Sequence, residues 1–389
     1  MSAALRVADV IRSCWETYNR SNGLPPHVGR AVRRILRCRT QALGGHIHEC
    51  DRCGGQVPMY NSCQDRHCPT CQTSGKEKWL SKRRRELLPV QYFHAVFTLP
   101  HALNGLIDAN RKLLLGELFT TVNWVLQAFA HDPQWRLEGA LGFLAVLHTW
   151  TQKLQEHFHL HCIIPGGVWR EHTAEWIPCR DRWLFRKDSL AAAFRTRYLK
   201  RLSALRRQGK LRFTGAAAPL ANKTVWDQLI TQLDNATWIV YPKSAPASAK
   251  KALEYLGRYT HKVAISDHRI LSLRNGIVTF SWRDRNDNNT VKTAQLPAVE
   301  FTKRFCYHIL PHGFQKIRYY GWLSAGKRKH ALPAIRAAMA VPEPEADEDI
   351  PLVERILQRT GIDITLCPHC EKGHLRKTSI VIPPKRGPP

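Results

Sequence analysis

The sequence His157-Phe158-His159-Leu160-His161-Cys162-Ile163-Ile164 alternates imidazole and apolar side chains. In a β-strand successive side chains point to opposite faces, so His157, His159 and His161 would share one face while their neighbours enter a core. Imidazole is the commonest protein ligand for divalent metals, and two imidazoles two positions apart on one strand can reach a single ion. We therefore expect a metal site on this strand. The alternative is a half-buried strand whose histidines face water.

Two tyrosines follow nearly a hundred residues later, in the segment Tyr255-Leu256-Gly257-Arg258-Tyr259. The segment reads as a helix, in which residues i and i+4 share a face. A phenol is a competent covalent nucleophile when a neighbour activates or positions it. A metal pocket together with paired phenols predicts phosphoryl transfer with Tyr255 and Tyr259 as catalytic residues. Two tyrosines that merely pack are the alternative.

The charge of the chain indicates the class of its partner. The 389 residues carry a formal net charge of +28 and a pI near 10.0. Such an excess favours a polyanion, with nucleic acid the first candidate and an acidic membrane surface the second. We see no apolar run of membrane-spanning length and no signal-peptide core, and we expect a cytoplasmic protein without a membrane partner.

The twelve cysteines are expected to bind metal rather than form disulfides, because the cytoplasm is reducing. Cys50-x2-Cys53 and Cys68-x2-Cys71 are two knuckles at zinc-ribbon spacing. We expect them to form one structural Zn²⁺ site of four thiolates, with Cys63 as an alternative ligand. The pair Cys367 and Cys370 supplies half a tetrahedral site, so it either recruits further ligands for a possible second zinc or binds none.

The pattern along the chain predicts five segments and two basic surfaces. The segments are a helical lead-in (1–43), a zinc ribbon plus basic helix (44–88), a domain with the metal strand and tyrosine helix (89–296), which the resemblance described below implies is the nuclease domain, a basic helical DNA-binding region (297–340), and an acidic linker with a Cys-x2-Cys tail (341–389). The cations expected to contact DNA phosphates, rather than form a merely solvated face, are Lys82, Arg83, Arg84, Arg85, Lys316 and Arg318. Arg274-Asn275-Gly276 predicts a tight hairpin.

In combination, these motifs resemble the rolling-circle transposases of the insertion sequence ninety-one family, a two-tyrosine branch of the HUH endonucleases. The matching segments, in order, are Tyr60-Asn61-Ser62-Cys63, Arg66-His67-Cys68-Pro69-Thr70-Cys71, Phe97-Thr98-Leu99-Pro100-His101, Leu147-His148-Thr149-Trp150, the histidine strand with Pro165-Gly166-Gly167, the tyrosine segment, and Leu310-Pro311-His312-Gly313-Phe314. They extend from the ribbon to about Leu323.

The resemblance implies an α+β fold, in which a central antiparallel sheet of HUH type is flanked by helices and preceded by a helical segment and a zinc ribbon. It implies that His159-Leu160-His161 is the HUH element, with Gln152 best placed as third ligand of Mg²⁺ or Mn²⁺ and His157 as an alternative. It also implies that Tyr255 and Tyr259 are the nucleophiles, with Arg258 beside them as a cation for DNA.

The implied activity is cleavage and transfer of single-stranded DNA at the ends of a mobile element, through a 5′-phosphotyrosine, in the nucleoid of a bacterium. The chain has no Gly-x4-Gly-Lys-Ser/Thr motif, so a host helicase and replication machinery are expected partners. Two rival functions are a non-catalytic zinc-ribbon DNA-binding protein and a metal-dependent nuclease that uses water.

Overall fold

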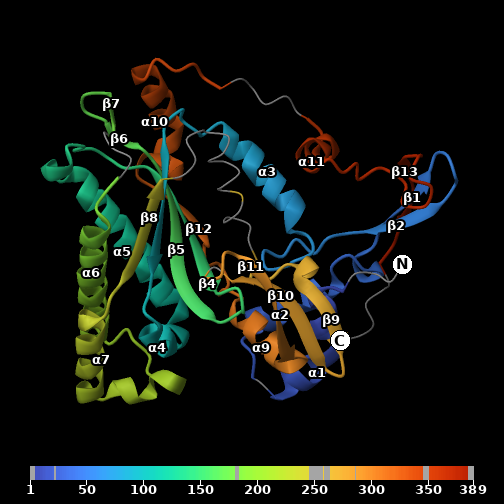
Figure 1. Ribbon diagram of the computed structural model, residues 1–389, viewed down its shortest axis with the longest axis horizontal. Helices are drawn as coiled ribbons and strands as arrows, with labels where there is room; N and C mark the ends of the chain where they lie inside the picture. Colours follow the sequence, from blue (N-terminus) through green and yellow to red (C-terminus); the bar gives the residue numbers. More distant parts are fainter. Residues whose placement is uncertain are drawn as a thin grey trace.

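The computed structural model describes residues 5–21, 23–179, 184–244, 257, 263–284, 286–344 and 350–383. Its centre is a five-stranded antiparallel sheet with strand order β12-β4-β5-β3-β8 (Figure 1). The strands are β3 (Tyr92–Thr98), β4 (Phe143–Trp150), β5 (Glu156–Pro165), β8 (Ile239–Ser244) and β12 (Ile317–Tyr320). The α+β class expected from the sequence is confirmed.

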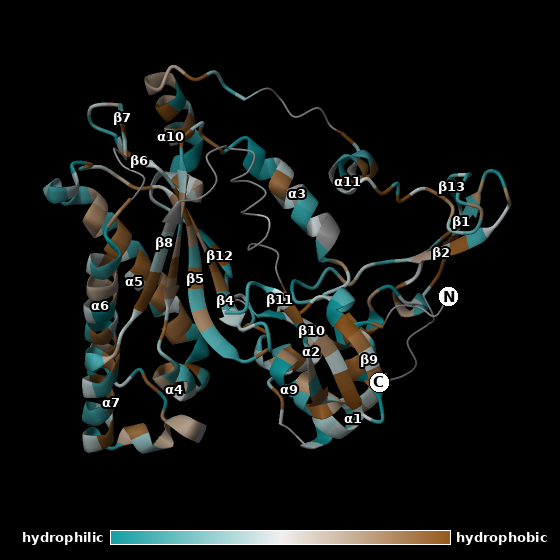
Figure 2. Ribbon diagram, viewed as in Figure 1, coloured by the Kyte–Doolittle hydropathy of each residue, from teal (hydrophilic) through white to brown (hydrophobic). Residues whose placement is uncertain are grey.

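One face of this sheet carries the main hydrophobic core. Phe158, Leu160 and Cys162 of β5 are almost fully buried there, which confirms the predicted alternation of the histidine strand. The helices on this face are α4 (Asn104–Ala109), α5 (Arg111–His131), α6 (Lys187–Arg207) and α7 (Lys223–Asn235). Figure 2 shows α5 largely hydrophobic where it lies against the sheet. By length and composition α5 could also cross a membrane, but half of its apolar window is buried inside the protein.

The opposite face of the sheet carries the histidines and is partly covered by α3 (Gln72–Arg84). Leu80 of α3 packs in one cluster with Val146 of β4 and Ile163 of β5. Because Val146 and Ile163 stand two residues from His148 and His161, α3 covers the part of this face next to the histidines. The short hairpin β6 (Gly167–Arg170) and β7 (Glu175–Pro178) follows β5.

A second core unites the N-terminal helices with a part of the chain that lies between β8 and β12 in sequence. The N-terminal helices α1 (Val7–Ser21) and α2 (Pro26–Arg37) pack against a three-stranded sheet and α9. The elements of that partner unit are β9 (Ile270–Arg274), β10 (Ile277–Asp284), β11 (Thr290–Pro297) and α9 (Ala298–Tyr307). The helices of the predicted lead-in (1–43) therefore pack against residues beyond 263, which fall partly within the predicted nuclease domain (89–296).

The C-terminal tail also returns to the N-terminal region. A third sheet has strand order β13-β1-β2, formed by β1 (Gly45–Cys50), β2 (Gln56–Tyr60) and β13 (Leu375–Val381). It lies away from the five-stranded sheet (Figure 1). Between β12 and β13 the chain forms α10 (Ala325–Ala338) and α11 (Leu352–Thr360). The 3-10 helices are Gln41–Leu43, His101–Leu103, Pro133–Trp135, Gly215–Ala221, Asp267–Arg269 and Gly321–Leu323.

Candidate active site and metal centres

Three histidines from two neighbouring strands meet on the face of the sheet opposite the main core. His159 and His161 lie on β5, and His148 on β4 stands directly opposite His159 in the antiparallel register. The side chains of all three are buried, and the nitrogen atoms that could ligate a metal lie within 4.8 Å of one another. Three imidazoles this close fit a divalent cation, with the remaining coordination positions open to water or substrate.

Hydrogen bonds determine which ring nitrogens could ligate a metal. Nδ1 of His159 lies 2.9 Å from the main-chain carbonyl of His157. A carbonyl only accepts, so Nδ1 carries the proton and Nε2 carries the lone pair. Nδ1 of His161 lies 2.8 Å from Nε2 of His94, on the neighbouring strand β3. This bond orients the His161 ring in the manner typical of the outer partners of metal-bound histidines.

The third member of the cluster is His148, where sequence reasoning favoured Gln152 with His157 as the alternative. Gln152 lines the same pocket, and its main-chain carbonyl accepts a 2.6 Å hydrogen bond from Arg269. The His157 ring is half-buried and lies 4.7 Å from the His159 ring, between centroids, near the start of β5. The segment Leu147-His148-Thr149-Trp150 drew attention to His148 in the sequence, but only the β4–β5 register shows that His148 lies opposite His159.

The histidine cluster opens into a pocket of about 750 Å³ between the central sheet and the second core. Tyr241 of β8 lines this pocket and projects from the histidine face, because it pairs with Val96, which in turn pairs with His161. The opposite wall includes Trp282, with Lys153 Nζ 4.0 Å from the centre of its ring. The cations Lys153, Arg269 and Arg283 also line the pocket. The pocket thus combines the histidine cluster, aromatic rings and positive charge.

The predicted nucleophiles Tyr255 and Tyr259, and Arg258 between them, lie outside the described residues. Gly257, the one described residue of their motif, lies against α3. A Cβ atom built on it would stand 3.0 Å from Cε of Lys76 and 3.1 Å from Cδ1 of Leu80. Because Leu80 packs over the histidine face, this glycine lies on the same side of the sheet as the histidine cluster.

The predicted phosphate-binding cations differ in what they contact. Lys82, Arg84 and Arg85 are exposed on and after α3. Arg83 instead points inward, where it donates a 2.9 Å hydrogen bond to the Tyr319 hydroxyl and pairs with Glu86 at 3.0 Å. Lys316 lies over the ring of Trp150, which stacks on His148, so its charge is close to the histidine cluster. Arg318 lies over the ring of Phe119 at 4.1 Å on the other face.

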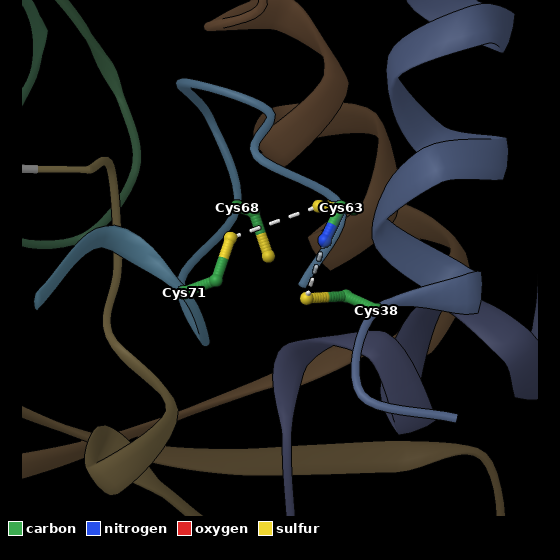
Figure 3. Close-up of side chains that lie close together, drawn as sticks. All are labelled: Cys38, Cys63, Cys68 and Cys71. Atoms are coloured by element: carbon green, nitrogen blue, oxygen red, sulfur yellow. Dashed lines mark hydrogen bonds between the residues drawn. The ribbon is translucent and has the colours of Figure 1, made fainter. Parts of the chain in front are cut away.

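Eight of the twelve cysteines form two clusters of four, in a grouping that corrects the predicted one. The first contains Cys38, Cys63, Cys68 and Cys71, all buried in the second core (Figure 3). The sulfur atoms of Cys63 and Cys71 lie 3.8 Å apart. For zinc–sulfur bonds of about 2.3 Å, the edge of a regular tetrahedron is also about 3.8 Å. These residues therefore fit a structural zinc ion with no open coordination position.

The predicted site from Cys50, Cys53, Cys68 and Cys71 is wrong, because the two knuckles belong to different clusters. Cys38, at the end of α2, completes the first cluster, and Cys63 is a member of it rather than an alternative. Cys50 and Cys53 lie instead with Cys367 and Cys370. The physical reason is the pairing of β13 with β1, which brings the tail to the first knuckle.

The first cysteine cluster is fastened to the rest of the molecule by Arg66 and His67. Nε2 of His67 accepts a 3.1 Å hydrogen bond from the Leu310 amide, while its Nδ1 contacts Asp65 at 3.0 Å. Burial lowers the pKa of His67 despite this carboxylate. Arg66 donates to the carbonyls of Pro311 and Phe314. Two motifs quoted from the sequence, around 66–71 and 310–314, thus bind each other.

Comparisons with known proteins agree with this arrangement. The family model described as "Putative transposase" matches residues 142–331, and the one described as "Transposase zinc-binding domain" matches residues 10–99. The "Putative transposase y4qJ" of Sinorhizobium fredii (strain NBRC 101917 / NGR234) is 38% identical over 373 residues, which cover 95% of this chain and 94% of the relative.

A second relative is the "Transposase for insertion sequence element IS801" of Pseudomonas savastanoi pv. phaseolicola, 26% identical over 343 residues, or 85% of this chain and 79% of the relative. No solved structure matches the chain. The two family models, and the match to the first relative over nearly the whole of both chains, lead to one assignment. This chain belongs to the insertion sequence ninety-one (IS91) family of transposases, with an N-terminal zinc-binding domain.

Proposed function

We propose that this transposase nicks single-stranded DNA and transfers the strand through a 5′-phosphotyrosine, as a rolling-circle enzyme of HUH type. His148, His159 and His161 are the metal ligands in this proposal, and Tyr255 and Tyr259 are the nucleophiles. The observation that carries it is the cluster of three buried histidines, which faces a basic and aromatic pocket. The position of Gly257 on the histidine side of the sheet supports the placement of the tyrosine motif there.

The tyrosines would perform the covalent step. A phenolate oxygen attacks the scissile phosphorus in line, the bond from phosphorus to the 3′ oxygen breaks, and that oxygen takes a proton to leave a free 3′-OH. Bound Mg²⁺ or Mn²⁺ would supply positive charge against the phosphate oxygens. The new ester retains the energy of the broken bond, so strand rejoining needs no ATP. Two tyrosines allow one to hold the cut end while the other cleaves a second site.

The pocket suits single-stranded DNA because it offers both contacts that such proteins use. Aromatic side chains stack on bases, and cations track the backbone. Tyr241 and Trp282 supply the rings, and Lys153, Arg269 and Arg283 the charge. Exposed Lys82, Arg84 and Arg85 on the neighbouring α3 would extend the phosphate track. A host helicase would supply the single strand, since this chain has no nucleotide-binding loop of the Walker type.

The test is incubation of the purified protein with labelled single-stranded DNA from the element's ends and Mg²⁺ or Mn²⁺, followed by a denaturing gel. We expect a covalent protein–DNA band that EDTA abolishes and that a Tyr255→Phe/Tyr259→Phe double variant lacks. Cleavage without that band would indicate hydrolysis by water. Binding with neither product, on correct ends, would indicate a DNA-binding protein without nuclease activity.

Two histidine variants test whether His148, rather than the nearby His157, is the third ligand of the metal ion. Changes to outer partners of a metal ligand typically cost about 10–100-fold in metal affinity or activity. We therefore expect His148→Ala to reduce cleavage by more than about 100-fold and His157→Ala, the matched control, by less than about 10-fold. The reverse order would move the third ligand from β4 to the start of β5.

A further inference from the structure

The second cysteine cluster is divided between residues more than three hundred positions apart. Cys50 lies 3.7 Å from Cys370, and Cys53 lies 3.8 Å from Cys367, between sulfur atoms. The family zinc-binding domain, residues 10–99, contains one half of this cluster only. We propose that Cys50, Cys53, Cys367 and Cys370 bind a second zinc ion, which fastens the C-terminal tail to the N-terminal ribbon.

The two halves of the cluster have the same backbone geometry. In each, the residue four positions after the first cysteine donates its amide to that cysteine's carbonyl, at 3.1 Å for Gly54 and 2.9 Å for Glu371. Both residues adopt positive φ angles, 69° for Gly54 and 54° for Glu371. Glutamate is rarely found in this left-handed region, so the Cys-x2-Cys turn imposes the conformation. These are two copies of one metal knuckle, facing each other.

Main-chain amides point at the sulfur atoms, as they do where thiolates are stabilised. The amides of Arg52 and Cys53 lie 3.4 and 3.5 Å from the Cys50 sulfur. In the other knuckle the His369 amide lies 3.4 Å from the Cys367 sulfur, and the Gly373 amide 3.4 Å from that of Cys370. Hydrogen bonds to a charged acceptor favour the charged form, here the thiolate that ligates zinc.

The space around the sulfurs fits an ion and excludes two disulfides. A disulfide requires sulfur atoms about 2.05 Å apart, whereas a zinc tetrahedron places them about 3.8 Å apart. Glycines allow the main chain to approach this closely. A Cβ atom on Gly373 would stand 2.5 Å from the Cys50 sulfur, and one on Gly55 would stand 3.2 Å from the Cys53 sulfur. Four thiolates leave no open position, so the ion is structural.

Without the ion, the tail would be held to the ribbon by the pairing of β13 with β1 and by the contact between Asp51 and His374. β13 pairs with β1 from Gly45 opposite Val381 to Cys50 opposite Leu375. Asp51 and His374 exchange two hydrogen bonds, in which the Asp51 amide donates to the His374 carbonyl at 3.0 Å and the His374 amide donates to the Asp51 carboxylate at 2.8 Å. Upstream in the tail, α11 contacts α3, the helix beside the histidine face. Zinc would therefore anchor the part of the tail that follows α11, the helix that contacts α3.

The two zinc sites differ in exposure, which makes the second one separable in an experiment. All four cysteines of the first cluster are buried in the second core. In the split cluster, Cys53 is exposed and Cys370 is half-buried. A chelator reaches an exposed ligand first. We therefore expect the split site to release its zinc before the buried site, and the tail to detach while the second core remains folded.

The experiment measures zinc content by mass spectrometry of the metal, together with hydrogen exchange of β1 and β13, on the full chain purified with zinc. Because the histidine cluster can also take up zinc, the readout is the difference between variants: Cys367→Ser/Cys370→Ser should hold one ion per chain fewer than wild type and lose protection in β1 and β13. Cys14→Ser, a half-buried thiol outside both clusters, is the matched control and should hold as many ions as wild type. Partial removal of zinc from wild type by EDTA should reproduce the exchange pattern of the double variant.

Two results would overturn the proposal. One is an equal zinc content in wild type and Cys367→Ser/Cys370→Ser, with β1 and β13 equally protected before and after chelation. The other is a titration of the denatured chain that finds fewer than its twelve cysteines as free thiols, because the split cluster would then be oxidised rather than metal-bound. Because none of these readouts depends on DNA cleavage, failure here and failure of the nuclease proposal are distinguishable.

Discussion

Tyr241 tests whether the histidine pocket holds single-stranded DNA. Its side chain lines the pocket and the residue is 54% exposed, so it contributes little to the core. Stacking of one base on an aromatic residue is worth about 1–3 kcal/mol when measured by alanine substitution. Since about 1.4 kcal/mol changes an equilibrium constant tenfold, Tyr241→Ala should weaken binding about 5- to 150-fold and leave the unfolding free energy almost unchanged.

The assay is fluorescence anisotropy with a labelled single strand at one fixed salt concentration. Tyr241→Phe keeps the ring and should bind within about threefold of wild type, a change of less than about 0.7 kcal/mol. Trp124→Ala removes an aromatic residue of similar exposure, 44%, from α5 on the other side of the sheet, and should have no effect. Equal affinity of Tyr241→Ala and wild type, or an equal loss from Trp124→Ala, would refute the placement of DNA in this pocket.

Three further predictions concern acid stability, docking of the zinc module and salt. Burial lowers the pKa of His308 to about 3, so as pH falls below about 6.5 this residue takes up a proton in the unfolded chain but not in the folded one. Acidification from pH 7.5 to 5 should therefore lower the free energy of unfolding by about 2 kcal/mol through His308. In urea unfolding, the free energy of unfolding of His308→Gln should fall by about 2 kcal/mol less than that of wild type over the same pH range. Arg66→Ala leaves the carbonyls of Pro311 and Phe314 without this donor and should cost about 1–3 kcal/mol in the same assay, with Arg66→Lys losing less; no change would mean the contact is absent in solution. Lys82→Ala/Arg84→Ala should reduce the slope of log affinity for single-stranded DNA against log salt by about 1.4 if both side chains contact phosphate, and an unchanged slope would place them off the DNA.

Local patterns in the sequence predicted the parts of the fold that depend on neighbouring residues. The alternation around His159 gave both faces of β5, and Asn275-Gly276 gave the β9–β10 hairpin, where both residues have positive φ. Spacing alone could not reveal which strands pair. The β4–β5 register that places His148 opposite His159 is a non-local property, and the best local candidate, Gln152, lay closer in sequence.

The cysteine grouping failed for the same physical reason. Two Cys-x2-Cys knuckles eighteen positions apart, beginning at Cys50 and Cys68, match the spacing of a single ribbon, so proximity in sequence favoured one shared ion. The actual partners are Cys38, at the end of a helix, and Cys367 with Cys370, which come just before the strand that adds to the edge of β1. Both partnerships depend on tertiary packing that no local pattern encodes.

The second core has a consequence for how the chain folds during synthesis. The Val7 amide donates to the Asp267 carboxylate, a partner 260 residues later, and Cys14 contacts Thr302 of α9. At about 5–20 residues per second, the ribosome needs roughly 13–52 s to supply that partner. Throughout this interval α1 and α2 lack the part of their cover that β9, β10, β11 and α9 supply, while β3, β4, β5 and β8 of the five-stranded sheet are synthesised. The first helices to emerge are therefore among the last to be enclosed, which makes the nascent N-terminal region a target for chaperones and for aggregation.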